Sequence, residues 1–139
     1  MTESSGVIGH GAVLRRLAEA AEHGRLTHAL LFAGPDQVGK TTLALALATA
    51  LLHSQTWPGG PAAHPDLWVE DSEDQYIHID RLRLGGREGP TLQDFLALRP
   101  YAGGRRVAVM GRSDRLTEQA ADSLLKTVEE PPANSHLIL

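Results

Sequence analysis

An eight-residue glycine-rich segment at positions 34–41 constrains the fold of this chain more than any other feature. It reads Gly-Pro-Asp-Gln-Val-Gly-Lys-Thr and fits the pattern G-x-x-x-x-G-K-[ST]. An apolar stretch at residues 27–33 precedes it, and a stretch rich in alanine and leucine, without glycine or proline, follows at residues 41–52. A buried strand, a tight glycine turn and a helix in this order are typical of a phosphate-binding loop.

The residue types of this segment suit a nucleotide with Mg²⁺. Glycines let consecutive backbone N–H groups point at one centre, and the N-terminus of the following helix adds about half a positive charge. The lysine can reach the terminal phosphates, and the threonine hydroxyl after it can bind Mg²⁺. We therefore expect ATP or ADP with Mg²⁺ on Thr41, held by these residues: Gly34, Gln37, Val38, Gly39, Lys40, Thr41 and Thr42.

The rest of the chain alternates between helical and strand-like patterns. Apolar spacing predicts helices at residues 11–23, 41–52, 91–98 and 116–130, the last with Thr117 as N-cap, and strands at residues 27–33, 67–69, 106–110 and 136–139. Residues 76–79 are also strand-like, but we place 67–69 in the main sheet. Residues 53–65 contain two prolines close together, Pro58 and Pro61, which neither a helix nor a central strand would contain. We therefore expect this segment to be a connector. This alternation predicts an α/β fold, a parallel sheet with helices on both faces.

The strand at residues 106–110 is not followed by the acidic residues that nucleotide hydrolysis needs. Hydrolysis requires a carboxylate for the water shell of the metal and a second one to orient the attacking water. The next two positions are Gly111 and Arg112, and Asp114 comes three residues too late. Losing one preorganised group costs about 10²–10³ in rate, so we expect nucleotide binding with negligible turnover and no catalytic residue. The alternative is that Asp66 or Asp80 substitutes.

Six segments spread over nearly the whole chain form a pattern of their own. They are residues 8–10, 28–35, 64–66, 100–107, 116–117 and 120–132. The last contains Leu-Leu-Lys-Thr-Val-Glu-Glu-Pro-Pro and is the most specific. Together they resemble the N-terminal AAA+ module of bacterial clamp-loader subunits of DNA polymerase III. The resemblance implies a P-loop AAA+ fold over residues 1–139, with Val7, Ile8 and Gly9 beside the base of the nucleotide.

Within this family the chain is most similar to delta-prime subunits. The ATPase subunits, tau and gamma, carry Asp-Glu where this chain has Gly111 and Arg112, whereas delta-prime subunits often have a degraded site. The resemblance implies a scaffold in a DNA polymerase holoenzyme, assembled with tau/gamma and delta subunits, that helps to place a sliding clamp on primed DNA. An active ATPase of the tau/gamma kind is the alternative. Many relatives carry a zinc module before residues 64–66, but this chain has no cysteine there, so we expect no zinc.

Composition limits the partners and the cellular location that we expect for the protein. The 139 residues contain no cysteine, and the net charge of −4 argues against a broad basic face for nucleic acid. No apolar stretch is long enough to span a membrane, and the N-terminus lacks the pattern of an export signal, so we expect a cytoplasmic protein without a membrane partner. The apolar residues 136–139 at the very end predict a fragment, without the lid and collar domains that the family implies.

Overall fold

The structure is a computed structural model that describes residues 11–32, 39–70, 91–101, 104–111, 116–130 and 134–139. Its helices are α1 (Gly11–Glu22), α2 (Lys40–Leu52), α3 (Leu92–Ala97) and α4 (Glu118–Glu129), and a short 3-10 helix spans Pro61–Ala63. Its strands are β1 (Ala29–Leu30), β2 (Leu67–Glu70), β3 (Arg106–Met110) and β4 (Ser135–Ile138). Strands and helices therefore alternate along the described chain.

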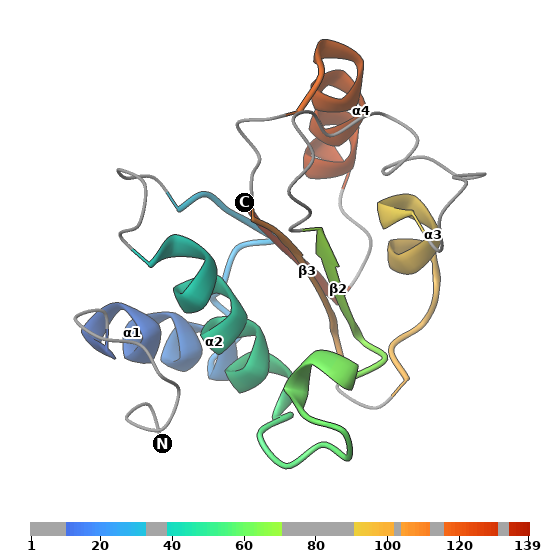
Figure 1. Ribbon diagram of the computed structural model, residues 1–139. Coiled ribbons are helices and arrows are strands. Elements are labelled where there is room, and N and C mark those ends of the chain that lie inside the picture. Colours follow the sequence, from blue (N-terminus) through green and yellow to red (C-terminus); the bar gives the residue numbers. More distant parts are fainter. Residues whose placement is uncertain (1–10, 33–38, 71–90, 102–103, 112–115, 131–133) are drawn as a thin grey trace.

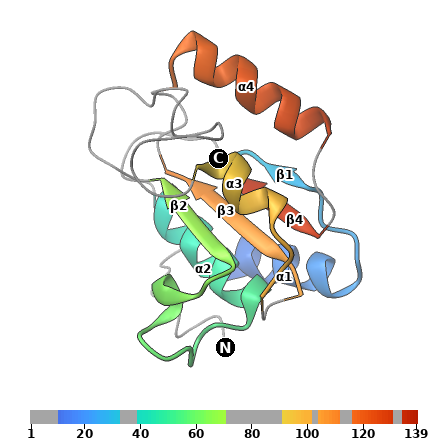
Figure 2. The same cartoon turned by 90° about the vertical axis from the view of Figure 1, so that its right-hand side faces the viewer.

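The strands form one parallel sheet in the order β1-β4-β3-β2. In the centre of this sheet, Val107 of β3 pairs with Leu67 of β2 on one side and with His136 of β4 on the other. Helices α1 and α2 lie on one face of the sheet, and α3 and α4 lie on the other (Figures 1 and 2). The predicted α/β fold is confirmed, and residues 67–69 lie in the main sheet as expected. Residues 76–79 lie outside the described part of the chain.

Strand β3 connects the two layers of the core because its side chains alternate between the two faces. Val107 and Val109 pack with the cluster under α1 and α2, whereas Ala108 and Met110 pack with the cluster under α3 and α4. All five residues of the strand are buried. A strand with helices on both sides favours apolar residues at successive positions, which explains the uninterrupted apolar run from Val107 to Met110 after the buried Arg106.

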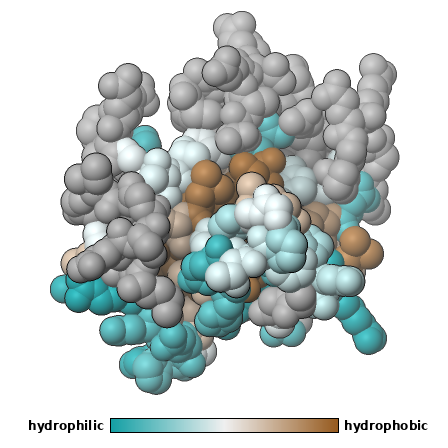
Figure 3. Space-filling model, turned by 60° about the horizontal axis from the view of Figure 1, so that its bottom comes forward, coloured by the Kyte–Doolittle hydropathy of each residue, from teal (hydrophilic) through white to brown (hydrophobic). Residues whose placement is uncertain are grey.

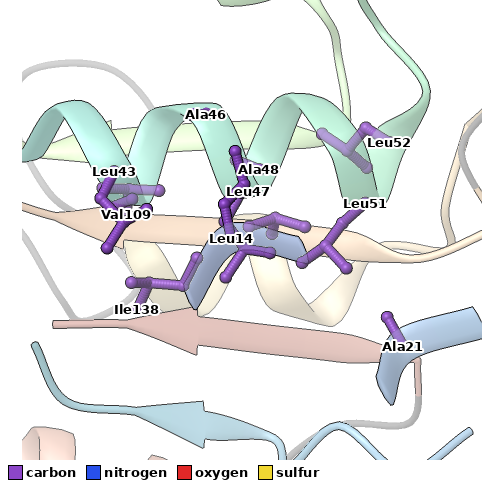
Figure 4. Packing of buried hydrophobic residues seen from close by; sticks show 12 residues of the cluster. Leu14, Ala21, Leu43, Ala46, Leu47, Ala48, Leu51, Leu52, Val109 and Ile138 are labelled. Carbon is purple, nitrogen blue, oxygen red and sulfur yellow. The ribbon is translucent and has the colours of Figure 1, made fainter. Parts of the chain in front are cut away.

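Helix α2 provides much of the first cluster. Leu43, Leu47 and Leu51 are spaced four residues apart and lie between the helix and the strands that carry Val109 and Ile138 (Figure 4). Leu47 is fully buried, with 0% of its surface exposed. The predicted buried face of this helix is confirmed, and it fixes the position of the helix N-terminus over the sheet.

Two helices on the opposite face begin with side-chain caps. The Thr117 hydroxyl accepts a hydrogen bond from the N–H of Ala120 at 3.2 Å, which confirms the predicted N-cap of α4. Helix α3 has only six residues, and a capping box supports it. There the Thr91 hydroxyl accepts from the N–H of Asp94 at 3.2 Å, and the Asp94 carboxylate accepts from the N–H of Thr91 at 3.1 Å.

Two expectations about local structure are wrong. The strand predicted over residues 27–33 and buried on both faces is only Ala29–Leu30, both half-buried, and Leu31 is 71% exposed. Within the described residues β1 pairs only with β4, so it is an edge strand with one open side. The connector at 53–65 contains the 3-10 helix, which accommodates Pro61 in its first turn, where a missing N–H breaks no helical bond.

The surface of the molecule mixes apolar and polar regions. Hydrophobic residues gather near the centre of the face in Figure 3, and hydrophilic residues line its lower rim. Among the described residues, no helix combines the length and the apolarity that crossing a bilayer would require.

Candidate nucleotide-binding site

The glycine-rich segment enters α2 through Gly39, the N-cap residue of the helix. The backbone of Gly39 is left-handed, with φ 91° and ψ 22°, a conformation that glycine adopts without strain. No side chain caps the helix, and its first turn contains no acidic residue. Because the first N–H groups of a helix have no acceptor within the helix and form its positive end, this terminus suits an anion.

Lys40, Thr41 and Thr42 form the first turn of α2. The side chains of Lys40 and Thr41 are half-buried, and that of Thr42 is exposed. The N–H of Leu43 donates to the carbonyl oxygen of Gly39 at 2.9 Å, so the helix is regular from its start. An ammonium group and a hydroxyl at this position are the groups that a phosphate and its Mg²⁺ need.

The structure describes only part of the predicted set of nucleotide contacts. It brings Gly39, Lys40, Thr41 and Thr42 together at the start of α2. The other predicted residues lie outside the described part of the chain: Val7, Ile8, Gly9, Gly34, Gln37 and Val38. Their contacts with a nucleotide stay predictions.

Position 111 lies at the same edge of the sheet as the start of α2, because all strands are parallel. Gly111 follows β3, and its N–H donates to the carbonyl oxygen of Glu70 at 2.8 Å. Val109 faces the α2 side and Met110 the other side, so alternation returns position 111 to the α2 side. A carboxylate at position 111 would face the side of the sheet on which α2 lies, and glycine has no carboxylate. Arg112 lies outside the described residues.

A buried acid that sequence patterns do not reveal also lies at this edge of the sheet. Glu70, the last residue of β2, is only 2% exposed. Its neighbour two residues earlier, Trp68, packs with the cluster under α3 and α4, so alternation places Glu70 on that face, away from α2. Two strands separate β2 from β1, a distance of about 14 Å at the usual strand spacing. Glu70 begins an acidic run in the sequence, and only its register opposite Met110 reveals its burial.

Of the two substitute acids considered from the sequence, the structure describes only Asp66, which does not reach the start of α2. Asp66 precedes β2 and therefore lies at the amino edge of the sheet, where its carboxylate is 3.5 Å from the guanidinium of Arg106. This edge is opposite to the one at which α2 begins. Asp80 lies outside the described residues.

Comparison with known proteins supports a relationship along nearly the whole chain. The family model described as "DNA polymerase III, delta subunit" matches residues 9–139. The chain is 30% identical over 137 residues to DNA polymerase III subunit tau of Salmonella typhimurium. The aligned region covers 96% of this chain and 21% of that protein. It is 32% identical over 142 residues to DNA polymerase III subunit gamma/tau of Mycobacterium tuberculosis. That aligned region covers 95% of this chain and 24% of that protein.

Similarity extends to an archaeal protein and to a solved structure. The chain is 32% identical over 127 residues to replication factor C small subunit of Methanococcus maripaludis, covering 91% of this chain and 36% of that protein. The crystal structure of a DNA polymerase III gamma subunit-related protein of Thermotoga maritima superposes with a TM-score of 0.71 at 26% identity, covering 91% of this chain and 38% of the other. The chain thus spans between about a fifth and two fifths of the length of these proteins.

Proposed function

Because the chain belongs to the family described as DNA polymerase III, delta subunit, we propose that it is a clamp-loader subunit of the delta-prime kind, which holds a nucleotide without hydrolysing it. One observation carries the proposal. The uncapped, left-handed start of α2 suits a phosphate, whereas the residue that follows β3 on the side where a metal-holding carboxylate would stand is Gly111.

The start of α2 fits a nucleotide triphosphate with Mg²⁺. Gly39 allows the backbone to approach a phosphate closely, and the first turn adds no negative charge to oppose it. Lys40 would pair with the terminal phosphates, and the Thr41 hydroxyl would hold Mg²⁺. When bound, the metal would neutralise phosphate charge. The described residues of this chain bind and orient the phosphates, and none of them activates water.

The proposed setting of this subunit follows from the family. It would assemble in the cytoplasm with tau/gamma and delta subunits, and through them it would contribute to opening a sliding clamp and placing it on primed DNA. Two of its relatives are named as DNA polymerase III subunits, and a third as a replication factor C small subunit, which supports a role in replication.

A second candidate function is an active ATPase of the tau/gamma kind. The relatives at 30–32% identity that carry the names tau and gamma/tau favour it. The glycine at position 111 opposes it, because a glycine cannot hold the water shell of a metal.

Nucleotide titration of the full-length protein tests the binding half of the proposal. We expect Lys40→Ala to weaken ATP binding about 10- to 100-fold, the usual effect of removing a charged hydrogen-bond donor. Lys126→Ala is the matched control, because it removes an exposed lysine of α4 and should leave binding unchanged. Thr41→Val should abolish the gain in affinity that Mg²⁺ gives, with little effect when Mg²⁺ is chelated. Equal affinities of the wild type and Lys40→Ala for ATP would contradict the proposal that ATP binds at the start of α2.

A further inference from the structure

Three basic side chains gather at the amino ends of neighbouring strands. His28 immediately precedes β1, Arg105 immediately precedes β3, and His136 is the second residue of β4. Because β4 lies between β1 and β3 in the sheet (Figure 2), His136 occupies the middle of the group. The ring centroids of His28 and His136 are 6.2 Å apart, and Nη1 of Arg105 is 3.3 Å from Nε2 of His136. We call these three residues the basic cluster.

Backbone contacts hold both rings so that Nε2 is the atom that can take up a proton. Nδ1 of His28 lies 3.1 Å from the carbonyl oxygen of Ser135, and Nδ1 of His136 lies 3.0 Å from that of Thr27. A carbonyl oxygen only accepts, so each Nδ1 carries its proton and each Nε2 has a lone pair in the neutral ring. On protonation both Nε2 atoms become donors beside the guanidinium of Arg105. The three side chains then present hydrogen-bond donors and no acceptor.

Positive charge in the basic cluster is not balanced by an acid. Within the described ranges, no carboxylate forms a hydrogen bond or an ion pair with any of its three side chains. Burial lowers the pKa of His136, and the charges of Arg105 and His28 lower it further, so both charges that act on this ring are positive. The buried acid at the same edge, Asp66, pairs with Arg106 instead. An uncompensated group of cations attracts an anion.

A protonated His136 needs an acceptor that the described residues do not supply. Its Nε2–H and the Nη1–H of Arg105 would face each other across 3.3 Å, and an oxygen atom beside them can accept from both. The planar guanidinium suits two oxygens of a phosphate, and the imidazolium of His28 adds positive charge nearby. We propose that the basic cluster binds the phosphate group of a small anion, inorganic phosphate or a phosphomonoester, together with a proton.

Charge and position favour a small phosphate over a strand of nucleic acid. A phosphomonoester carries a charge of about −1.5 to −2 at about pH 7, which three closely grouped cations can neutralise. Binding to a nucleic-acid backbone draws its strength from many cations spread along a surface, and this chain has a net charge of −4. The basic cluster lies at the amino edge of the sheet, opposite to the start of α2, so it is separate from the proposed nucleotide site.

Nuclear magnetic resonance of the histidine side chains tests the proposal. The full-length protein carries Lys40→Ala, so that phosphate does not bind through the lysine at the start of α2. We expect inorganic phosphate at about pH 6 to shift the ring signals of His28 and His136, with saturation at about 1–10 mM. The signal of His23, an exposed histidine after α1, should stay unchanged and is the internal control.

Sulfate tests whether a proton binds with the anion, because the charge of sulfate does not change near neutral pH. Its affinity should fall about 10-fold between about pH 6 and about pH 7.5, since the histidines lose the proton that the anion requires. Arg105→Gln should weaken phosphate binding at least about 10-fold, and His28→Gln, a change at an exposed ring, about 3-fold. Arg16→Gln removes the same charge from exposed α1 and is the matched control.

The proposal is overturned if phosphate up to about 50 mM leaves the ring signals of His28 and His136 unchanged, or if Arg105→Gln and Arg16→Gln bind it equally. An affinity for sulfate that does not change with pH would also overturn it, because the proton is part of the site. Tighter binding of single-stranded DNA without a terminal phosphate at the same rings would overturn it in favour of nucleic acid. None of these readouts depends on ATP binding at α2.

Discussion

His136, the second residue of β4, is held in one tautomer by two contacts. Its Nδ1 lies 3.0 Å from the carbonyl oxygen of Thr27, which can only accept, so Nδ1 carries the proton. In the neutral ring Nε2 then accepts from the guanidinium of Arg105 at 3.3 Å. The ring also stacks on that of His28, with centroids 6.2 Å apart. A second proton on the ring would put an N–H against the N–H of Arg105.

These surroundings predict how stability depends on pH. Burial lowers the pKa of His136 below its ordinary value of 6.5, and the charges of Arg105 and His28 lower it further, against the opposing effect of the hydrogen bond to Thr27. The unfolded chain therefore binds more protons than the folded chain between the lowered pKa and 6.5. The free energy of unfolding should fall as the pH decreases through this window, and be fully retained above it.

Denaturant unfolding at about pH 7.5 and about pH 5.5 measures this dependence. The wild type should lose more stability between the two values than His136→Gln, which cannot take up the proton. His23→Gln, which replaces an exposed histidine after α1, is the matched control for removing a histidine elsewhere in the chain. A slope that is the same in the wild type and His136→Gln would refute this account of His136.

At the scale of single elements, sequence predicted best where both faces of an element are covered. Strand β3 has the predicted bounds, and α2 begins one residue earlier than predicted. Both elements consist mostly of apolar residues, so few positions in a fold other than a buried one would suit them. Strand β1 is much shorter than its apolar run, since its length depends on neighbours that the sequence does not specify. Glu70 was missed for the same reason, because only the sheet register buries it.

Helix α4 offers a test of a capping residue predicted from the sequence. Thr117→Ala should lower the free energy of unfolding by about 1 kcal/mol, because the N–H of Ala120 loses its acceptor at the helix start. Thr117→Ser keeps a hydroxyl at the same position and should retain most of the stability. Denaturant unfolding of the three proteins checks this order, and equal losses in the two variants would show that the hydroxyl is not what matters.

At the scale of the whole molecule, the parallel sheet separates two sets of polar groups. The start of α2 and Gly111 lie at its carboxyl edge, while the ion pair of Asp66 and Arg106 lies at its amino edge. Sequence patterns predicted the phosphate segment and the absence of acids after β3, because both depend on neighbouring residues. They did not predict the ion pair, which joins residues 40 positions apart, or the strand order, in which β1 pairs with a strand 108 positions later.

The proposed function makes one claim about the whole molecule, that it binds ATP and does not cleave it. Phosphate release by the full-length protein with ATP and Mg²⁺ measures this most directly, with Lys40→Ala as the background. The account predicts that the wild type releases phosphate no faster than Lys40→Ala under conditions in which it binds ATP. Release that depends on Mg²⁺ and disappears in Lys40→Ala would contradict it and identify the protein as an active ATPase.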